Sequence, residues 1–438
     1  MAARPDPADR ADRAAARLAA AVAALDTAVE RQLNAVLAHP DFQKLEAAWR
    51  GLRYLVDQLP EAGGPVRVRV LSATWGELAK DQERAIEFDQ SHLFRRVYSD
   101  EFGTPGGTPY GLLVGDYAVP NRPAALAALA GVAAVAAAAF APFVAAVTPG
   151  FLGVDQFAEI DPMLDAGRLT DGDDHRGWRS FRQSEDSRFV GLAVPRVLLR
   201  SPHTDPPGHG HGFPFRQPAG AGVYGSGAWA VAAVVVRAFA DTGWLAAVRG
   251  AGGAAPELAH HDPRPEVGFA APVAADAAFT DRQEKELADL GLIPLVHQPG
   301  AGGAVVYTMP SAQRPKAFDG AGATANAKLS AMLPHVLCAS RVAHYLKVLC
   351  RDRIGSFTSP HEVADALRQW VRRYVVSNDS ASPELKARHP LRDAKVEVWE
   401  IPGRPGHYRC TMHLQPHYQL DALAAGIRLT TELTAGTG

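Results

Sequence analysis

The longest helical pattern of the chain runs from residue 326 to residue 357. Its apolar residues return every three or four positions, as Leu329, Met332, Leu333, Val336, Leu337, Ala343, Leu346 and Leu349. This spacing predicts a helix with one buried face. The opposite face carries four cationic or titratable side chains, Arg341, His344, Lys347 and Arg351. We expect them to form a basic stripe, which is either a solvated face or a contact for an acidic partner.

The remaining pattern predicts a mixed α/β protein. Residues 10–59 are expected to form two helices broken near His39-Pro40, with Asp41 as the cap of the second. Further helices are predicted over residues 75–98, 123–147, 226–248 and 281–290. Strands are predicted over residues 66–70, 112–116, 190–199, 293–296 and 305–309. A break is expected near residue 320, so we expect several domains.

The C-terminal third alternates apolar and polar residues in three short segments. Residues 395–401 and 408–414 flank the turn sequence PGRPG and predict a β-hairpin with one buried face. The third segment contains Ile427, Arg428, Leu429 and Thr430. It predicts either a third strand of the same sheet or a strand that pairs with a neighbouring subunit. The fold class is therefore α/β (mixed α+β), with a helical N-terminus and an antiparallel, β-rich C-terminal region.

Composition narrows the functional classes. The 438 residues contain 45 Lys and Arg against 47 Asp and Glu, which argues against a nucleic-acid binder driven by bulk charge. The three cysteines are widely spaced and fit a reducing compartment. Residues 123–149 carry no charge but are mostly alanine and contain Pro142, so we expect a buried helix followed by a second short one, and no membrane insertion. We expect a cytoplasmic protein.

Three motifs could carry chemistry. The GxGxxG pattern of residues 220–225 follows a proline-rich loop, whereas a dinucleotide site needs a strand there. His203, His209 and His211 share a Pro/Gly-rich loop that supplies no rigid support for a metal, and we expect this loop to be dispensable. Glu185 and Asp186 lie between arginines and predict a salt-bridged turn. We therefore expect no enzyme activity, no cofactor and no functional metal.

The chain resembles a known family over roughly residues 35 to 433. Residues 326–357 contain SRVAHYLK and end in RDRIGSF, and residues 39–55 read HPDFQKLEAAWRGLRYL. Collinear blocks follow at 87–117, 178–182, 184–188, 195–200, 290–295, 313–316 and 390–394. These blocks are similar to the large contractile-sheath subunit of the type VI secretion system, the TssC/VipB/ImpC/EvpB family. The chain departs from the family pattern at residues 224–229, which read YGSGAW, and in the loop before them.

The resemblance implies an assembly protein with a contractile-sheath-like fold. Such a subunit would pair with a small sheath subunit of the TssB/VipA type and polymerise with copies of itself around an Hcp-type tube on a baseplate. Contraction would propel the tube for effector delivery, and a ClpV-type AAA+ ATPase would recycle the sheath. Residues 1–64 would form a helical segment that pairs with the small subunit, 65–320 a central α/β region, and 321–438 a C-terminal sheath domain.

Two alternatives stay open at this point. A phage-tail-like or extracellular injection particle also has a contractile sheath, usually built from one sheath chain. A metal- or nucleotide-dependent enzyme would instead use the histidine loop or the glycine turns.

Overall fold

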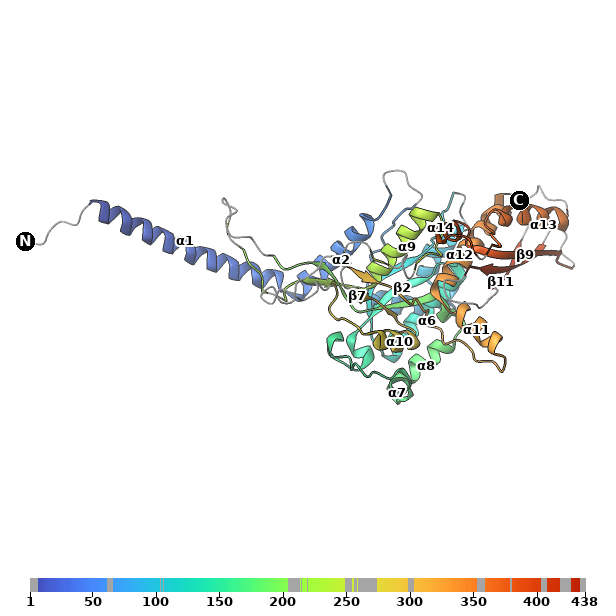
Figure 1. The fold of residues 1–438 in the computed structure, drawn as a ribbon, viewed down its shortest axis with the longest axis horizontal. Helices are drawn as coiled ribbons and strands as arrows, with labels where there is room; N and C mark the ends of the chain where they lie inside the picture. The colour runs from blue at the N-terminus through green and yellow to red at the C-terminus, as the bar shows by residue number, and fades with distance from the viewer. Residues whose placement is uncertain are drawn as a thin grey trace, which may run out of the picture.

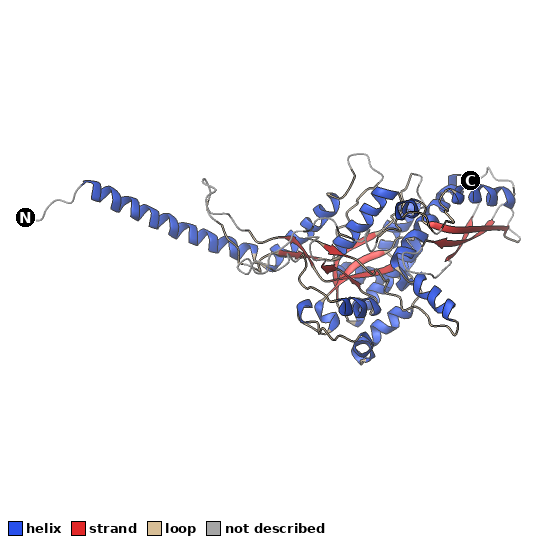
Figure 2. Cartoon of the chain, viewed as in Figure 1, coloured by secondary structure: helices blue, strands red, loops and turns tan. Residues whose placement is uncertain are grey.

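A computed structural model describes most of the chain. The residues outside the description are 1–6, 61–65, 103, 105, 204–212, 214, 219, 249–253, 256–257, 259–273, 298–302, 353–358, 379, 403–407, 418–426 and 434–438. Helices and strands are both present throughout the described body (Figure 2), so the predicted mixed α/β class is confirmed.

The centre of the molecule is a parallel sheet with the strand order β1-β2-β3-β6. Its strands are β1 (Leu113–Val119), β2 (Phe143–Val147), β3 (Val190–Val194) and β6 (Ile293–Pro294). Successive side chains of a strand point to opposite faces. Phe143, Ala145 and Val147 accordingly join one core, and Val144 joins the other.

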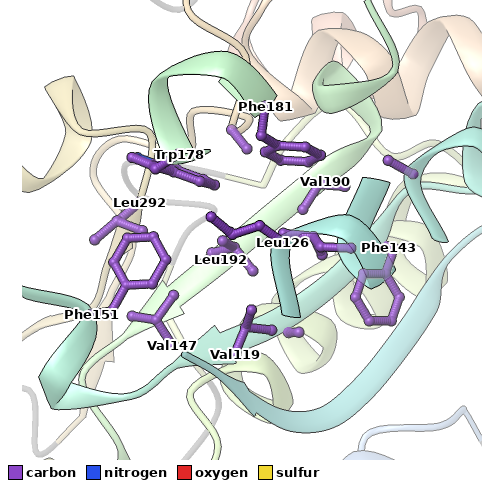
Figure 3. Close-up of a cluster of buried hydrophobic side chains, with 14 of the residues drawn as sticks. Val119, Leu126, Phe143, Val147, Phe151, Trp178, Phe181, Val190, Leu192 and Leu292 are labelled. Carbon is purple, nitrogen blue, oxygen red and sulfur yellow. The ribbon is translucent and has the colours of Figure 1, made fainter. Parts of the chain in front are cut away.

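Helices cover both faces of this sheet. Helices α6 (Pro123–Ala139) and α8 (Arg176–Gln183) contribute to the first core, where Trp178 packs edge-on against Phe151 over the sheet (Figure 3). Helix α9 (Ala228–Thr242) covers the other face, and Val231 and Val234 belong to its core. Parallel strands are buried on both sides in this arrangement, so they appear in the sequence as continuous apolar runs.

The other elements complete the body. The other α-helices between residues 65 and 300 are α3 (Trp75–Arg84), α4 (His92–Phe94), α5 (Asp100–Phe102), α7 (Ala166–Asp171) and α10 (Asp281–Asp289). Short turns of helix lie at Phe88–Gln90, Arg95–Ser99, Pro149–Leu152, Phe157–Glu159, Asp173–His175 and Asp186–Phe189. Two small antiparallel pairs are β4 (Val197–Arg200) with β5 (Val223–Gly225), and β7 (Val296–His297) with β8 (Ala304–Val305).

The C-terminal region forms a separate sheet. Strands β9 (Leu391–Glu400), β10 (Tyr408–Pro416) and β11 (Ile427–Leu433) are antiparallel in the order β11-β10-β9. Helices α12 (Leu333–Asp352) and α13 (Pro360–Arg372) share a core with this sheet, and α14 (Pro383–Arg388) precedes it. Val396, Met412 and Leu414 are buried there. The predicted hairpin with one buried face is confirmed.

The N-terminal helices form an arm. Helix α1 (Pro7–Leu37) points away from the body, and α2 (Pro40–Val56) connects it to the sheet region (Figure 1). The predicted break at His39-Pro40 is confirmed. The cap differs from the prediction, because His39 is the N-cap and its ring accepts a hydrogen bond from the backbone N–H of Asp41. In the described residues, no helix combines the length and the apolar character that crossing a membrane requires.

Several predicted boundaries were wrong. Residues 143–147 form strand β2 and no second helix, because the apolar helix ends at Ala139 with Phe140 as its left-handed C-cap, and a short apolar run fits a buried strand equally well. Residues 190–199 split at Pro195 into two strands that belong to different sheets. Residues 75–98 form α3 and several short turns. The long C-terminal helix is divided into α11 (Ala321–Ser330) and α12.

Candidate assembly surfaces

Helix α1 carries a stripe of exposed apolar side chains along one face. The stripe consists of Leu18, Val22, Leu25, Val29, Leu33 and Val36, each at least 39% exposed. The intervals of three and four residues place them on one line, the spacing that coiled-coil seams use. A 31-residue helix is roughly 46 Å long at 1.5 Å per residue. An exposed apolar line of that length is typical of a surface that another helix covers.

Helix α2 is fixed to the body by packing and charge. Leu55 is 5% exposed and packs with Trp229 of α9. A side chain at Gly51 would overlap the indole of the same tryptophan, so only glycine allows this approach. The carboxylate of Glu46 accepts a hydrogen bond of 2.6 Å from Arg200, which is 7% exposed. The arm therefore starts from a rigid base.

The predicted basic stripe of α12 is largely inside the molecule. His344 is 3% exposed, and its Nε2 lies 2.9 Å from the carbonyl oxygen of Ala139. This bond requires the proton on Nε2. Burial, aided by the nearby charges of Arg341 and Lys347, lowers the pKa of His344 to about 4, so the imidazole is neutral at pH 7.

Lys347 occupies a cage of aromatic rings. Its Nζ lies 5.0 Å from the ring centre of Tyr98, 4.6 Å from that of Phe102 and 5.0 Å from that of Phe140. Ring faces attract a cation. Burial lowers the pKa of this ammonium group. The cage therefore holds Lys347 as part of the packing of α12 against residues 95–102 and the end of α6.

Arg341 is also packed against rings. Its guanidinium lies 5.0 Å from the ring centre of Phe239 and 4.5 Å from that of Tyr345, to whose hydroxyl it also donates a hydrogen bond of 3.0 Å. The side chain of Arg351 lies outside the described residues. The prediction of an exposed cationic face on α12 was wrong for His344, which is buried, while Arg341 and Lys347 are half-buried. The reason is that α12 packs between one core of the central sheet and the core of the C-terminal sheet.

The final strand lies in its own chain's sheet. Residues Ile427 to Leu433 pair with residues Leu414 to Tyr408 of β10 in a continuous antiparallel register. Ile427, Arg428, Leu429 and Thr430 are therefore the third strand that the alternation allowed, and their inner edge is occupied. Within the described residues the outer edge of β11 pairs with no strand, so a neighbour could use that edge only.

The motifs that could have carried chemistry contribute to packing and ion pairs where the structure describes them. Gly222 lies where a side chain would meet Leu198 at 2.6 Å, so the GxGxxG pattern lets β5 approach β4. Glu185 forms ion pairs with Arg188 and Lys316, as the predicted salt-bridged turn requires. His209 and His211 lie outside the described residues. No group of three metal-binding side chains occurs among the residues that are described.

The sequence interpretation missed one feature, a cavity of about 1220 Å³ beside the edge of β1. Its walls come from α2, residues 66–73, β1, α9 and α12. The predicted strand 66–70 lines it, but these residues belong to no sheet in the structure. The only sign of this cavity wall in the sequence was the alternating segment of residues 66–70, in which Arg67 and Arg69 separate the valines.

Comparison with known proteins identifies the relatives of this chain. Residues 19–313 match a family described as EvpB/VC_A0108, tail sheath N-terminal domain, and residues 322–433 match its tail sheath gpW/gp25-like domain. The type VI secretion system sheath protein TssC1 of Pseudomonas aeruginosa is 38% identical over 426 residues, which cover 94% of this chain and 85% of that protein.

Two solved structures give looser alignments. The baseplate of the anti-feeding prophage aligns over 85% of this chain and 77% of its own, at 12% identity and a TM-score of 0.41. The contracted helical sheath of the same particle aligns over 68% and 65%, at 13% identity and a TM-score of 0.35. Only the sequence comparisons decide the family.

Proposed function

The chain belongs to the EvpB/VC_A0108 tail-sheath family and is a structural subunit of a contractile sheath, and we propose that it is the large subunit of a type VI secretion sheath. The observation that supports this most strongly is the match of both sheath domains in order, together with the identity to TssC1 over almost the whole chain. A sheath subunit acts through repeated contacts, since a non-closing interface between identical units generates a filament.

The arm gives this function a physical basis. We infer that the stripe on α1 pairs with a helix of a small sheath subunit, of the TssB/VipA type. Six apolar side chains in water are unfavourable by about 25 cal/mol for each Å² that a partner could cover. The rigid base at α2 holds the stripe at a fixed angle, so a partner on α1 is positioned relative to the body.

We further propose contacts with the other proteins of the secretion system. The assembled cylinder would enclose an Hcp-type tube, rest on a baseplate in the cytoplasm and be recycled by a ClpV-type ATPase after contraction. Residues 1–64 serve small-subunit pairing in this proposal, 65–320 form the central region, and 321–438 form the C-terminal domain. Contraction would exchange one set of interface contacts for another, as in other bistable assemblies.

Co-expression tests the proposal directly. The chain is produced alone and together with a small sheath subunit of the TssB/VipA type. Each lysate is examined by size-exclusion chromatography and negative-stain microscopy. We expect aggregation of the chain alone, because its arm is apolar, and cylinders with the partner. A stable, monodisperse monomer that forms no cylinder with the small subunit would contradict it.

A further inference from the structure

The direction of the arm depends on a joint of two residues. Helix α1 ends at Leu37 and α2 begins at Pro40, so Ala38 and His39 alone separate them, and α1 leaves the body beyond this joint (Figure 1). A change of about 20° at the joint would move the far end of a helix of roughly 46 Å by about 16 Å. The packing of α2 against the body therefore fixes the arm only if a second contact holds α1.

Arg200, the last residue of β4, holds the α2 side of the joint. Its guanidinium donates to both carboxylate oxygens of Glu46, at 2.6 and 3.3 Å. Arg50 donates to the same carboxylate at 2.7 Å. Because Arg200 is 7% exposed, little water reaches this ion pair, whereas water and salt weaken a pair on the surface. The pair thus attaches α2 firmly to β4.

The same guanidinium holds the loop that connects β4 to β5. It donates to the side-chain oxygen of Gln217 at 2.7 Å and to the carbonyl oxygen of Ser201 at 2.9 Å. The side-chain oxygen of Gln217 also accepts from the backbone N–H of His203 at 3.0 Å. The backbone N–H of Gln217 donates to the carbonyl oxygen of His203 at 2.8 Å. Gln217 is 5% exposed, so the two ends of the loop are joined to each other and to Arg200 inside the protein.

The residue before Gln217 contacts α1. The side-chain amide of Asn34 donates a hydrogen bond of 3.3 Å to the carbonyl oxygen of Arg216. Asn34 is half-buried, whereas most of the residues of α1 that precede it are exposed. Arg216 is thus attached to α1, and Gln217 is attached through Arg200 to α2. Two consecutive residues of one loop therefore connect to both sides of the joint.

We propose that residues 215–217 are a clamp that fixes the direction of the arm, with Arg200 as its positioning residue. One attachment on each helix removes the freedom that a single attachment would leave at the joint. The clamp gives every copy in a sheath the same arm direction, which a filament of identical contacts requires. This role in assembly rests on the proposed function. The sequence predicts that the loop is dispensable, and the clamp restricts that prediction to the residues between its two ends.

Distances between two spin labels test the clamp. para-Acetylphenylalanine replaces the exposed residues Ala20 of α1 and Ser180 of α8, and each copy carries a ketone-reactive nitroxide, so the native thiols stay unlabelled. The sample is the soluble heterodimer with the small subunit. When Asn34→Ala and Gln217→Met are added, we expect the distribution of distances to become at least about twofold broader, because α1 then swings at the joint. An equally narrow distribution with and without the two substitutions would overturn the inference.

Two matched variants separate the clamp from a general loss of structure. Gln217→Glu keeps the acceptors for Arg200 and for the N–H of His203, and Glu46 already faces two arginines, so the added charge is balanced. This variant should keep the narrow distribution. Gln32→Ala removes an exposed amide about half a turn from Asn34 and should keep it as well. A broad distribution in either variant would contradict the clamp.

Electron microscopy measures what the clamp contributes to assembly. The variant with Asn34→Ala and Gln217→Met keeps the apolar stripe of α1, so it should bind the small subunit within about twofold of wild type. We expect at least about tenfold less sheath, because a mobile arm has to be ordered at every new contact. Wild-type amounts of sheath from a variant with a broad distribution would overturn the role of the clamp in assembly.

The failure of this inference is separable from that of the proposed function. If wild-type chains form no heterodimer and no cylinder, the proposed function fails, and the label distances are measured on the soluble chain alone. If wild-type chains form both and the double variant keeps a narrow distribution, only the clamp is wrong.

Discussion

Helices α1 and α12 differ in which of their side chains, apolar or charged, are exposed at the surface of the chain. Helix α1 carries an apolar line that lies in solvent, with Leu25 65% exposed. Helix α12 carries the basic stripe, in which Arg341 and Lys347 are half-buried and the neutral His344 is 3% exposed. In a single globular chain the apolar line would be buried and the cationic line solvated. The difference supports the proposal that α1 binds a partner, whereas Arg341 and Lys347 of α12 already contact aromatic rings within the chain.

The largest expected effect comes from the apolar line of α1. Leu25→Glu with Val29→Glu should abolish sheath assembly, because two carboxylates would have to enter an apolar interface. The central body should keep its fold, since α1 leaves it. The measurement is pull-down of the small subunit with microscopy of the same lysate.

A matched control carries the same charges on the opposite face of α1. Ala23→Glu with Thr27→Glu lies about half a turn away from the apolar line and should assemble normally. Equal assembly by both double variants would mean that the exposed line binds nothing.

Removal of the final strand separates an internal role from a role between subunits. Deletion of residues 426–438 removes every pair between β11 and β10. At about 1 kcal/mol for each net hydrogen bond, we expect several kcal/mol of lost stability in the C-terminal sheet. The measurement is hydrogen exchange of the β10 amides in the heterodimer, with deletion of residues 434–438 as the control. Unchanged protection of β10 with loss of long sheaths would instead place the strand between subunits.

Reversal of one charge tests the interior of α12. Lys347→Glu would place a carboxylate against three ring faces and should destabilise the heterodimer by roughly 2–4 kcal/mol, because the charge is partly buried and repelled. Lys347→Met has a similar volume and should cost less than about 1.5 kcal/mol. Thermal unfolding measures both. If Lys347→Glu unfolds at the wild-type temperature but fails to assemble, Lys347 would instead belong to an exposed surface that binds a partner.

The last prediction concerns pH. Because burial lowers the pKa of His344 from 6.5 to about 4, the unfolded chain binds a proton there between these values and the folded chain does not. Stability from this group is therefore complete above pH 6.5 and is lost as the pH falls towards 4. The slope is at most about 1.4 kcal/mol per pH unit.

His344→Gln isolates this contribution. The amide of glutamine can donate to the carbonyl of Ala139 but does not titrate, so the variant should lose less stability on acidification. Buried His335, whose pKa is also lowered to about 4, acts equally in both proteins. Parallel curves of unfolding temperature against pH would show that the imidazole of His344 is not the group responsible.

Local patterns determined many elements of this protein. Alternation over residues 395–414 predicted the hairpin β9-β10, and the alanine-rich segment from residue 10 to His39 predicted α1. The order of the sequence blocks that resemble the family, from HPDFQKLEAAWRGLRYL to PLRDA, pointed to the family that both sheath-domain matches show. Helix periodicity and strand alternation depend only on neighbours within a few residues, so a single sequence is enough to reveal them.

Tertiary structure alone decided which faces are buried. Nothing near Lys347 in the sequence indicates that Tyr98, Phe102 and Phe140 surround it, because these rings come from segments more than 200 residues away. Residues 143–147 became a strand for the same reason: an apolar run fits a helix or a strand, and pairing with β1 and β3 selected the strand. Residues 66–70 have the alternation of a strand but found no partner within the described chain. Pattern specifies what a segment can form, and the contacts with distant segments specify what it does form.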